Sequence, residues 1–346
     1  MLRPGLVLAA VLAVALAGAC GTKEPAGQVA TAEPTPSDPI PSTSSTTTAP
    51  EVTTTTTTTA TATTTSAPAT NAVTTPPAAA AAPAAPAPPA ATLQAPPTTT
   101  APARPASVGA EAARLAGQIR TAHATVVDPA APKDALAAAA HLEQQVFRNV
   151  VNQPELAPPL YAALPAELRG YAEANVTAGL RLRSMTTRPR QTFPDWRIVP
   201  PAPAGELLSY YKEAEAAYGV PWAYLAGIHL VETRMGRIRG VSSAGAQGPM
   251  QFMPATWAAF GQGDVNDNRD AIFAAARYLK RNGAPGDMRN ALWNYNHDNR
   301  YVDAVVLHAQ QMQADERNYF GYHGWQVYYV MVGGDALLHE GWTKPA

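Results

Sequence analysis

The chain of 346 residues contains a single cysteine, Cys20, so no intramolecular disulfide can form. Any domain in it must therefore take its stability from a packed core. The sequence also lacks a cluster of basic residues with interleaved aromatic residues, and its formal net charge is −1. These two absences argue against nucleic acid as a partner.

Large apolar residues are almost absent between residues 21 and 105, where runs of threonine, alanine and proline take their place. Such a segment cannot bury enough apolar surface to offset the entropy lost on folding. We therefore expect residues 21–105 to form a disordered tether, which proline stiffens toward an extended conformation. Composition alone does not distinguish a functional spacer from a segment whose sequence is free to vary.

Residues 1–20 have the pattern of an export signal, with Arg3 ahead of an apolar run over residues 6–16. Residues 16–20 read Leu-Ala-Gly-Ala-Cys and resemble a bacterial lipobox, although Ala17 replaces the preferred leucine. The resemblance implies lipidation of Cys20, so we expect an exported, extracytoplasmic protein anchored in the cell membrane and facing the cell wall. Simple secretion and a membrane-spanning helix are the alternatives. The uncharged run is shorter than the roughly 20 residues that a span needs.

Apolar residues recur at helical spacing from residue 106 onward, which predicts a mostly α fold. Residues 106–194 should form a helical subdomain in which nothing converges on chemistry. Residues 195–346 should form a second set of short amphipathic helices, each begun by proline or by a capping residue. These expected starts are Pro254, Asp267 or Asn268, Asp287 and Asp298.

A carboxylate stands out in this second region, because Glu232 shares a helical face with Leu225 and Ile228. An apolar setting raises the pKa of a carboxyl group and lets it hold a proton near neutral pH, as a general acid requires. By pattern alone a structural ion pair is the simpler explanation. The arginines that offer such a pair are Arg234, Arg237 and Arg239.

An ordered motif follows Glu232. Residues 242–257 read Ser-Ser-Ala-Gly-Ala-Gln-Gly-Pro-Met-Gln-Phe-Met-Pro-Ala-Thr-Trp, and the pair Tyr295-Asn296 lies downstream. With Glu232, these segments resemble in order the signature of the soluble lytic transglycosylase (SLT) family, which has a lysozyme-like fold. Two departures stand out, since Pro249 replaces the usual leucine and His297 follows the pair where many members have alanine.

The resemblance implies that residues 195–346 are a lysozyme-like catalytic domain that cuts peptidoglycan glycan strands. Glu232 would protonate the bond between N-acetylmuramic acid and N-acetylglucosamine, then accept a proton from the muramic six-position hydroxyl. The product would carry a 1,6-anhydromuramic end. The positions that match the family's substrate-binding residues are Ser242, Met250, Gln251, Tyr295 and Asn296.

Alternatives remain for several of these residues. Ser242 either reaches the carboxylate or substrate, or caps a turn. Tyr295 either orients Glu232 by a hydrogen bond or packs in the core, and both roles are compatible. No cofactor is implied. No metal is expected either, because the acidic loop that begins at Asp264 lacks the glycine and glutamate of a calcium loop.

The sequence shows no second carboxylate in a comparable position, although most glycosidases use two. A lone acid fits an attack by a hydroxyl group of the substrate itself. A hydrolytic muramidase and a non-catalytic peptidoglycan-binding lipoprotein stay open as alternative functions.

Overall fold

Helices dominate the computed structural model, which describes residues 107–345. This part of the chain forms eleven α-helices, so the predicted mostly α fold is confirmed. Their bounds are α1 Val108–Val127, α2 Lys133–Asn152, α3 Ala157–Ala163, α4 Ala166–Met185, α5 Ala204–Tyr218, α6 Trp222–Thr233, α7 Pro254–Phe260, α8 Asn268–Arg281, α9 Met288–Tyr295, α10 Asn299–Ala314 and α11 Arg317–His323. A short 3-10 helix, η1 Pro154–Leu156, precedes α3.

Side-chain caps fix the starts of several helices. The predicted caps Asp267, Asp287 and Asp298 each accept a hydrogen bond from a backbone N–H in the first turn of α8, α9 and α10, at 2.8 to 3.0 Å. Ser107 does the same for α1. These bonds satisfy N–H groups that have no partner inside a helix. The helix starts read from the sequence are therefore confirmed.

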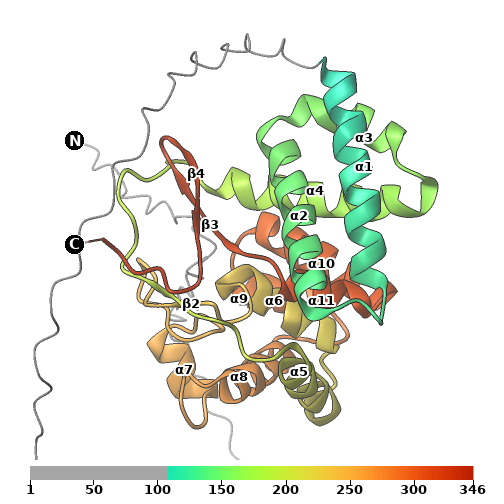
Figure 1. Cartoon of the computed structure of the whole chain (residues 1–346). Coiled ribbons are helices and arrows are strands. Elements are labelled where there is room, and N and C mark those ends of the chain that lie inside the picture. Colours follow the sequence, from blue (N-terminus) through green and yellow to red (C-terminus); the bar gives the residue numbers. More distant parts are fainter. Residues whose placement is uncertain (1–106, 346) are drawn as a thin grey trace, which may run out of the picture. The chain divides into compact units, whose positions relative to one another are not determined.

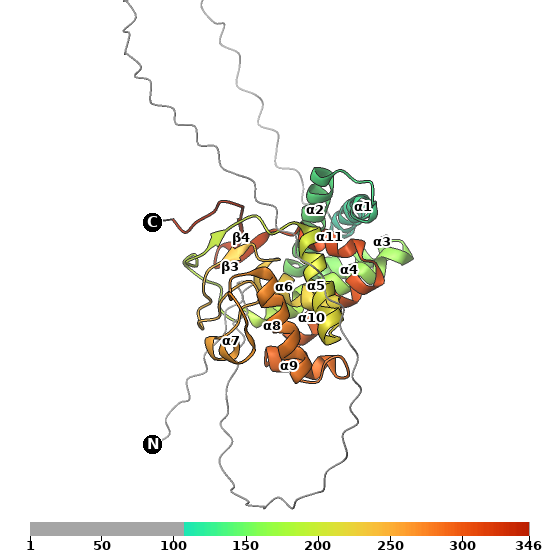
Figure 2. The same cartoon turned by 90° about the horizontal axis from the view of Figure 1, so that it is seen from below.

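The helices fall into two groups that pack on one another. Helices α1 to α4 lie together on one side, and α5 to α9 lie on the other in both views (Figures 1 and 2). Helix α10 packs against both α4 and α6, and α11 packs against α1 and α2. Residues 107–345 fall within one compact unit, so the boundary between residues 106–194 and 195–346 stays a prediction.

Two short antiparallel pairs of strands complete the described fold. Strand β1 Arg197–Ile198 pairs with β2 Ile238–Arg239, and β3 Val327–Met331 pairs with β4 Gly334–Leu338. Their apolar side chains form a small core of their own, separate from the main helical core. This small core contains Trp196, Ile198, Ile238, Val327, Tyr329 and Leu338. The sequence pattern predicts only helices after residue 195, so the hairpin β3–β4 differs from the prediction.

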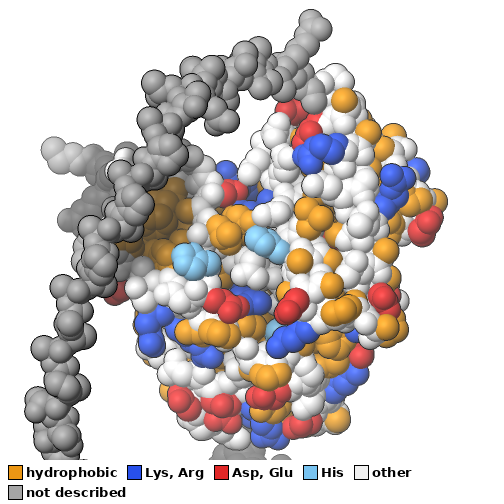
Figure 3. Space-filling model, viewed as in Figure 1, with side chains coloured by type: hydrophobic (Ala, Val, Ile, Leu, Met, Phe, Trp, Pro, Cys, Tyr) orange, Lys and Arg blue, Asp and Glu red, His pale blue; other side chains and the backbone are white. Residues whose placement is uncertain are grey.

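Acidic and basic side chains are interspersed over the face shown in Figure 3. Within residues 107–345, no helix is both long enough and apolar enough to cross a membrane. The predicted signal segment, the lipidation site at Cys20 and the tether lie outside the described residues.

Candidate active site

Glu232 is the penultimate residue of α6, a helix that is buried along most of its length. Its side chain is only 1% exposed, and burial raises the pKa of its carboxyl group well above the ordinary value, because the charged form loses its hydration. The Tyr301 hydroxyl acts in the opposite direction but more weakly. Among the described residues, neither Glu232 Oε2 nor the Tyr301 hydroxyl makes a hydrogen bond of full geometry. The site therefore holds a buried acid with one carboxyl oxygen that lacks a hydrogen bond.

The three nearby arginines do not neutralise this acid. Arg234 and Arg239 donate hydrogen bonds to backbone carbonyls, and Arg237 forms an ion pair with Glu340. None of them contributes to the pKa of Glu232. The structural ion pair that the sequence left open is therefore not formed.

The tyrosine beside Glu232 is Tyr301 rather than Tyr295. Tyr295 donates its hydroxyl proton to the carbonyl oxygen of Met250 at 2.6 Å, so it is not the donor expected for Glu232. The fully buried Tyr301 belongs to α10, which packs directly on α6. The two tyrosine rings lie parallel, with centroids 6.5 Å apart. The sequence alone does not predict that Tyr301 lies beside Glu232, because this contact depends on how α10 packs against α6.

Thr233 joins the end of α6 to the motif loop over residues 242–252. Its hydroxyl donates to the Pro249 carbonyl at 2.6 Å and accepts from the Gly236 N–H at 3.1 Å. The bond from Tyr295 to Met250 ties the same loop to the end of α9. The three motifs found in the sequence therefore meet in space at Glu232, the loop and the Tyr295-Asn296 pair.

Glycine is required at position 248 of the loop. Its φ is +73°, and a Cβ atom added there would lie 1.9 Å from the carbonyl oxygen of Val265. No side chain fits at that distance, whatever its chemistry. The loop is closed on either side of Gly248 by the paired backbone groups of Gln247 and Phe252. This close packing fixes the path of the loop past Glu232.

Ser242 opens this loop and caps its first turn. Its hydroxyl oxygen accepts hydrogen bonds from the N–H groups of Ala246 at 2.9 Å and Ala244 at 3.3 Å. The side chain is 8% exposed. The turn-capping role that the sequence left open is therefore filled, and contact with substrate stays a prediction.

Two of the predicted substrate-binding residues present polar atoms that lack partners. Gln251 is 5% exposed and uses its amide nitrogen on the Gly248 carbonyl, which leaves its Oε1 without a hydrogen bond. Asn296 is 6% exposed, and its Nδ2 has no partner among the described residues. Buried polar atoms are nearly always satisfied in folded proteins, so such atoms mark a place where a ligand can complete the bonding. The Gln251 Oε1 atom is a hydrogen-bond acceptor, and the Asn296 Nδ2 atom is a donor.

The Met250 side chain lies in the core, and His297 packs against an exposed tryptophan. The Met250 side chain is 0% exposed and belongs to the main core, so it offers no surface to a sugar in this structure. His297 lies edge-on to Trp293, with ring centroids 4.3 Å apart. Trp293 is 40% exposed, which is unusual for so large an apolar side chain.

The chain reverses direction sharply after Glu232. Arg234, Met235 and Gly236 have φ values of 53°, 58° and 79°, which place three consecutive residues in the left-handed region. For the two residues that carry a side chain, this conformation costs about 1 to 2 kcal/mol each. Such strain is typical of functional sites, because the surrounding packing has to hold it in place.

Two hollows lie beside the motif loop. One is lined by Phe193, Trp196, Ser242, Ser243 and Tyr329 among others, and the second by Trp196, Arg239, Gly240, Gly248 and Asn266 among others. Both combine aromatic rings with polar groups, as sugar-binding surfaces do. Glu232 is not among the residues that line these two hollows.

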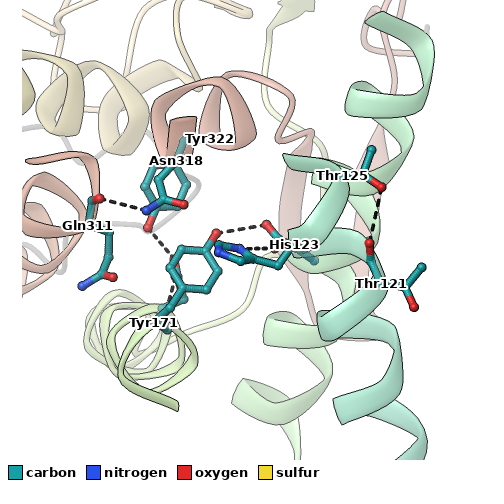
Figure 4. Close-up of polar contacts among 9 residues, drawn as sticks. Thr121, His123, Thr125, Tyr171, Gln311, Asn318 and Tyr322 are labelled. Atoms are coloured by element: carbon teal, nitrogen blue, oxygen red, sulfur yellow. Dashed lines mark hydrogen bonds and ion pairs between the residues drawn. The ribbon is translucent and has the colours of Figure 1, made fainter. Parts of the chain in front are cut away.

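A second buried glutamate provides a contrast with Glu232. Glu143 of α2 is 0% exposed, but its two carboxyl oxygens lie 3.0 Å from His123 Nδ1 and from the Tyr171 hydroxyl, which donates to it. Figure 4 shows Tyr171 between His123 and Tyr322. This network links α1, α2 and α4, and its carboxyl group is fully partnered. Glu143 is therefore a structural residue, whereas Glu232 lacks the bonds that would explain its burial.

Part of the chain that contains this site matches a known protein family. Residues 209–317 match the family model described as Transglycosylase SLT domain. The matched stretch runs from within α5 to the start of α11 and contains Glu232, the motif loop and Tyr295-Asn296. No curated protein and no solved structure matches the chain. The family match indicates a transglycosylase that acts on peptidoglycan.

Proposed function

We propose that this Transglycosylase SLT domain makes the chain a peptidoglycan lytic transglycosylase, with Glu232 as its catalytic acid and base. The observation that supports the proposal is the buried carboxyl group of Glu232, which has a raised pKa, leaves its Oε2 without a hydrogen bond, and lies beside Tyr301. A carboxyl with a raised pKa is protonated near neutral pH, and only a protonated group can donate a proton to a leaving oxygen.

The proposed reaction has two proton transfers through one residue. Glu232 first protonates the oxygen that joins N-acetylmuramic acid to N-acetylglucosamine, and that bond breaks as positive charge develops on the muramic ring. The resulting carboxylate then accepts the proton of the muramic six-position hydroxyl as this oxygen attacks the anomeric carbon. The product is a 1,6-anhydromuramic end, and Glu232 returns to its protonated form.

Hydrolysis by a muramidase is the nearest alternative, and the product distinguishes it. Digestion of purified peptidoglycan with the chain should release muropeptides that are lighter by one water than hydrolytic products, because no water is consumed. Mass spectrometry of the soluble fragments measures this difference directly. Recovery of reducing ends alone would reject the transglycosylase and favour the muramidase.

A non-catalytic peptidoglycan-binding protein is the second alternative. Glu232→Gln keeps the shape of the side chain but has no acidic proton, so we expect it to abolish cleavage while peptidoglycan pull-down is retained. Glu316→Gln is a matched control, because Glu316 is an exposed glutamate whose partner is Lys212 at the surface. Equal activity in wild type and Glu232→Gln would remove Glu232 from the mechanism.

We also propose that the unsatisfied atoms of Gln251 and Asn296 hold an acetamido group of the glycan. An acetamido group carries one donor and one acceptor, which matches the free Gln251 Oε1 and Asn296 Nδ2. Asn296→Ala should therefore raise KM for glycan fragments more than it lowers kcat. Ser242 and Tyr295 support this surface by holding the loop, and Met250 contributes its carbonyl oxygen to the same bonding.

Export and membrane anchoring through Cys20 complete the proposal and rest on the sequence pattern. A lipid anchor would keep the domain at the cell membrane while the tether extends toward the wall. Metabolic labelling with a fatty-acid probe should mark the wild-type chain and not Cys20→Ser. An unlabelled wild-type chain in the culture medium would instead support simple secretion.

A further inference from the structure

A cavity lies at the end of α6, next to Val231 and Arg234. Residues of α2, α4, α10 and the hairpin β3–β4 also line it. Its volume of about 70 Å³ is large enough for a small ligand or a few water molecules. None of the proposed catalytic or sugar-binding residues lines it. The polar and charged groups around it include Arg148, Arg183, Arg234, Asn152, His308 and Asp335.

The charges that line this cavity do not balance. Asp335 is its one acidic residue, and it forms ion pairs of 2.5 Å with both Arg148 and Arg183. Asn152 donates a third hydrogen bond to the same carboxylate. The cavity is therefore lined by three arginines and one aspartate, and the carboxylate oxygens of that aspartate already accept hydrogen bonds from other residues. The cavity has an excess of positive charge.

Arg234 carries that excess and has no acidic partner. It is 5% exposed, its Nη1 donates only to the Leu230 carbonyl, and its Nε has no partner among the described residues. Its guanidinium group lies over the Trp325 ring, 5.6 Å from the centroid. Burial lowers its pKa to about 9, and the nearby Arg148 adds to the effect. An unpaired buried cation is costly unless a ligand compensates it.

His308 stands next to Arg234 as a second polar group without a full set of bonds. Its side chain is 2% exposed and its Nδ1 has no partner in the described part of the chain. Burial and the charge of Arg234 lower its pKa to about 3, so the ring is neutral near pH 7. A neutral imidazole adds hydrogen-bonding capacity but no further charge.

Much of the remaining wall of the cavity is apolar, and the polar Gln144 and Asn175 in it are already bonded to other residues. The apolar residues include Phe147, Val151, Leu182, Val231 and Val330. A ligand that fits must therefore combine a negative group for Arg234 with a short apolar group for these walls. Inorganic anions supply the negative group but have no apolar group.

We propose that this cavity binds a small carboxylate that carries a short apolar group. The carboxylate would accept charge-assisted hydrogen bonds from Arg234 and leave the pairs of Asp335 intact, while the apolar group would fill the space between α2 and α4. A free short-chain carboxylic acid and the C-terminal residue of a peptide share this chemistry.

Thermal unfolding of the full chain tests the proposal without any glycan, so its outcome is independent of the proposed enzymatic function. The probes are butyrate, as a free acid, and N-acetylalanine, as a peptide C-terminus. At least one of them should raise Tm more than chloride at equal ionic strength, and the one that does identifies the source. Shifts no larger than that of chloride would overturn the proposal. Equal shifts from inorganic phosphate would overturn the role of the apolar walls.

Variants assign the effect to the cavity. Arg234→Met should weaken probe binding about tenfold or more, since it removes a charged donor. Arg277→Met is the matched control, because Arg277 also donates to a backbone carbonyl and lies over an aromatic ring, but away from the cavity. It should bind the probe as wild type does.

Asp335→Asn gives an effect of opposite sign and serves if Arg234→Met does not fold. It removes the one negative charge of the cavity, so the Tm shift caused by the probe should increase relative to its own baseline. A probe response that is unchanged in Asp335→Asn, or retained in Arg234→Met, would place the binding elsewhere.

Discussion

Replacement of Glu232 by glutamine should stabilise the folded chain at neutral pH. Burial of this carboxyl group raises its pKa, so the unfolded chain releases the proton at a lower pH than the folded chain does. The folded state then binds more protons than the unfolded state, and the free energy of unfolding falls as pH rises through that window. Glutamine has nearly the same shape and no proton to retain.

The size of the effect follows from the same linkage. Each pH unit between the two titrations lowers the free energy of unfolding by about 1.4 kcal/mol. The total stability of a typical domain is only about 5 to 15 kcal/mol, so an effect of this kind is measurable. The amide group of glutamine must itself be buried, which offsets part of this gain. A buried polar group without full bonding costs about 1 to 3 kcal/mol, and more when it is charged, so we expect Glu232→Gln to raise the free energy of unfolding at pH 7 by an amount within this range.

Glu143→Gln is the matched control for this prediction. Glu143 is equally buried, but its carboxyl oxygens are bonded to His123 and Tyr171, so the substitution removes favourable bonds. It should lower the free energy of unfolding by about 1 to 3 kcal/mol. Urea unfolding of wild type and both variants, from about pH 5 to pH 8, measures the two effects.

Opposite signs for the two variants at pH 7, with a gain for Glu232→Gln that grows as pH rises, are the expected result. A loss of stability in Glu232→Gln comparable to that of Glu143→Gln would refute the reasoning, because it would mean that the Glu232 carboxyl group makes favourable bonds in the folded chain.

Three further substitutions test other parts of the site. Tyr301→Phe removes the hydroxyl that favours ionised Glu232, so the pKa of the acid should rise and the alkaline limb of the pH–activity profile should move to higher pH. Gly248→Ala should lower the free energy of unfolding by more than about 3 kcal/mol in urea titrations, whereas Gly245→Ala, which has open space around it, should lose only about 1 kcal/mol. Thr233→Val should lose about 1 to 3 kcal/mol in the same assay, because it leaves a buried carbonyl unpaired.

Controls separate these effects from general loss of packing. Tyr322→Phe removes a buried hydroxyl that is bonded to Asn175 and does not contribute to the pKa of Glu232, so it should leave the pH–activity profile in place. Thr125→Val removes an exposed hydroxyl and should change stability by less than about 0.5 kcal/mol. Equal losses in Gly248→Ala and Gly245→Ala would contradict the close contact at position 248. A profile shift in Tyr322→Phe would contradict the assignment of Tyr301.

Much of the fold was predictable because its signals are local. Caps such as Asp267 and Asp287 act within one turn of the residues they satisfy, so the sequence locates the helix starts. The hairpin β3–β4 was missed because its strands gain stability from packing with Trp196, more than 130 residues earlier in the chain. Its alternation of buried and exposed residues is imperfect, so periodicity gives no clear strand signal.

The candidate site also has some features that the sequence predicts and others that depend on tertiary packing. The order of motifs led to Glu232, and the apolar neighbours correctly predicted a raised pKa. The sequence could not show that Tyr301, rather than Tyr295, faces the acid, since both tyrosines lie on buried stripes. The unpaired state of Arg234 was also beyond the sequence, because Glu232, two positions earlier, offered it a partner that the fold does not use.

The bonds that assemble the site join segments far apart along the chain. Thr233 and Pro249 are separated by 16 positions, and Met250 and Tyr295 by 45. Contacts between segments far apart in sequence carry a larger loop-closure entropy than contacts within a helix, so we expect them to form later in folding. During refolding, the circular dichroism signal of the helices should therefore return before cleavage activity does. A refolding chain should therefore pass through a stage that is already helical and in which the candidate site is not yet assembled.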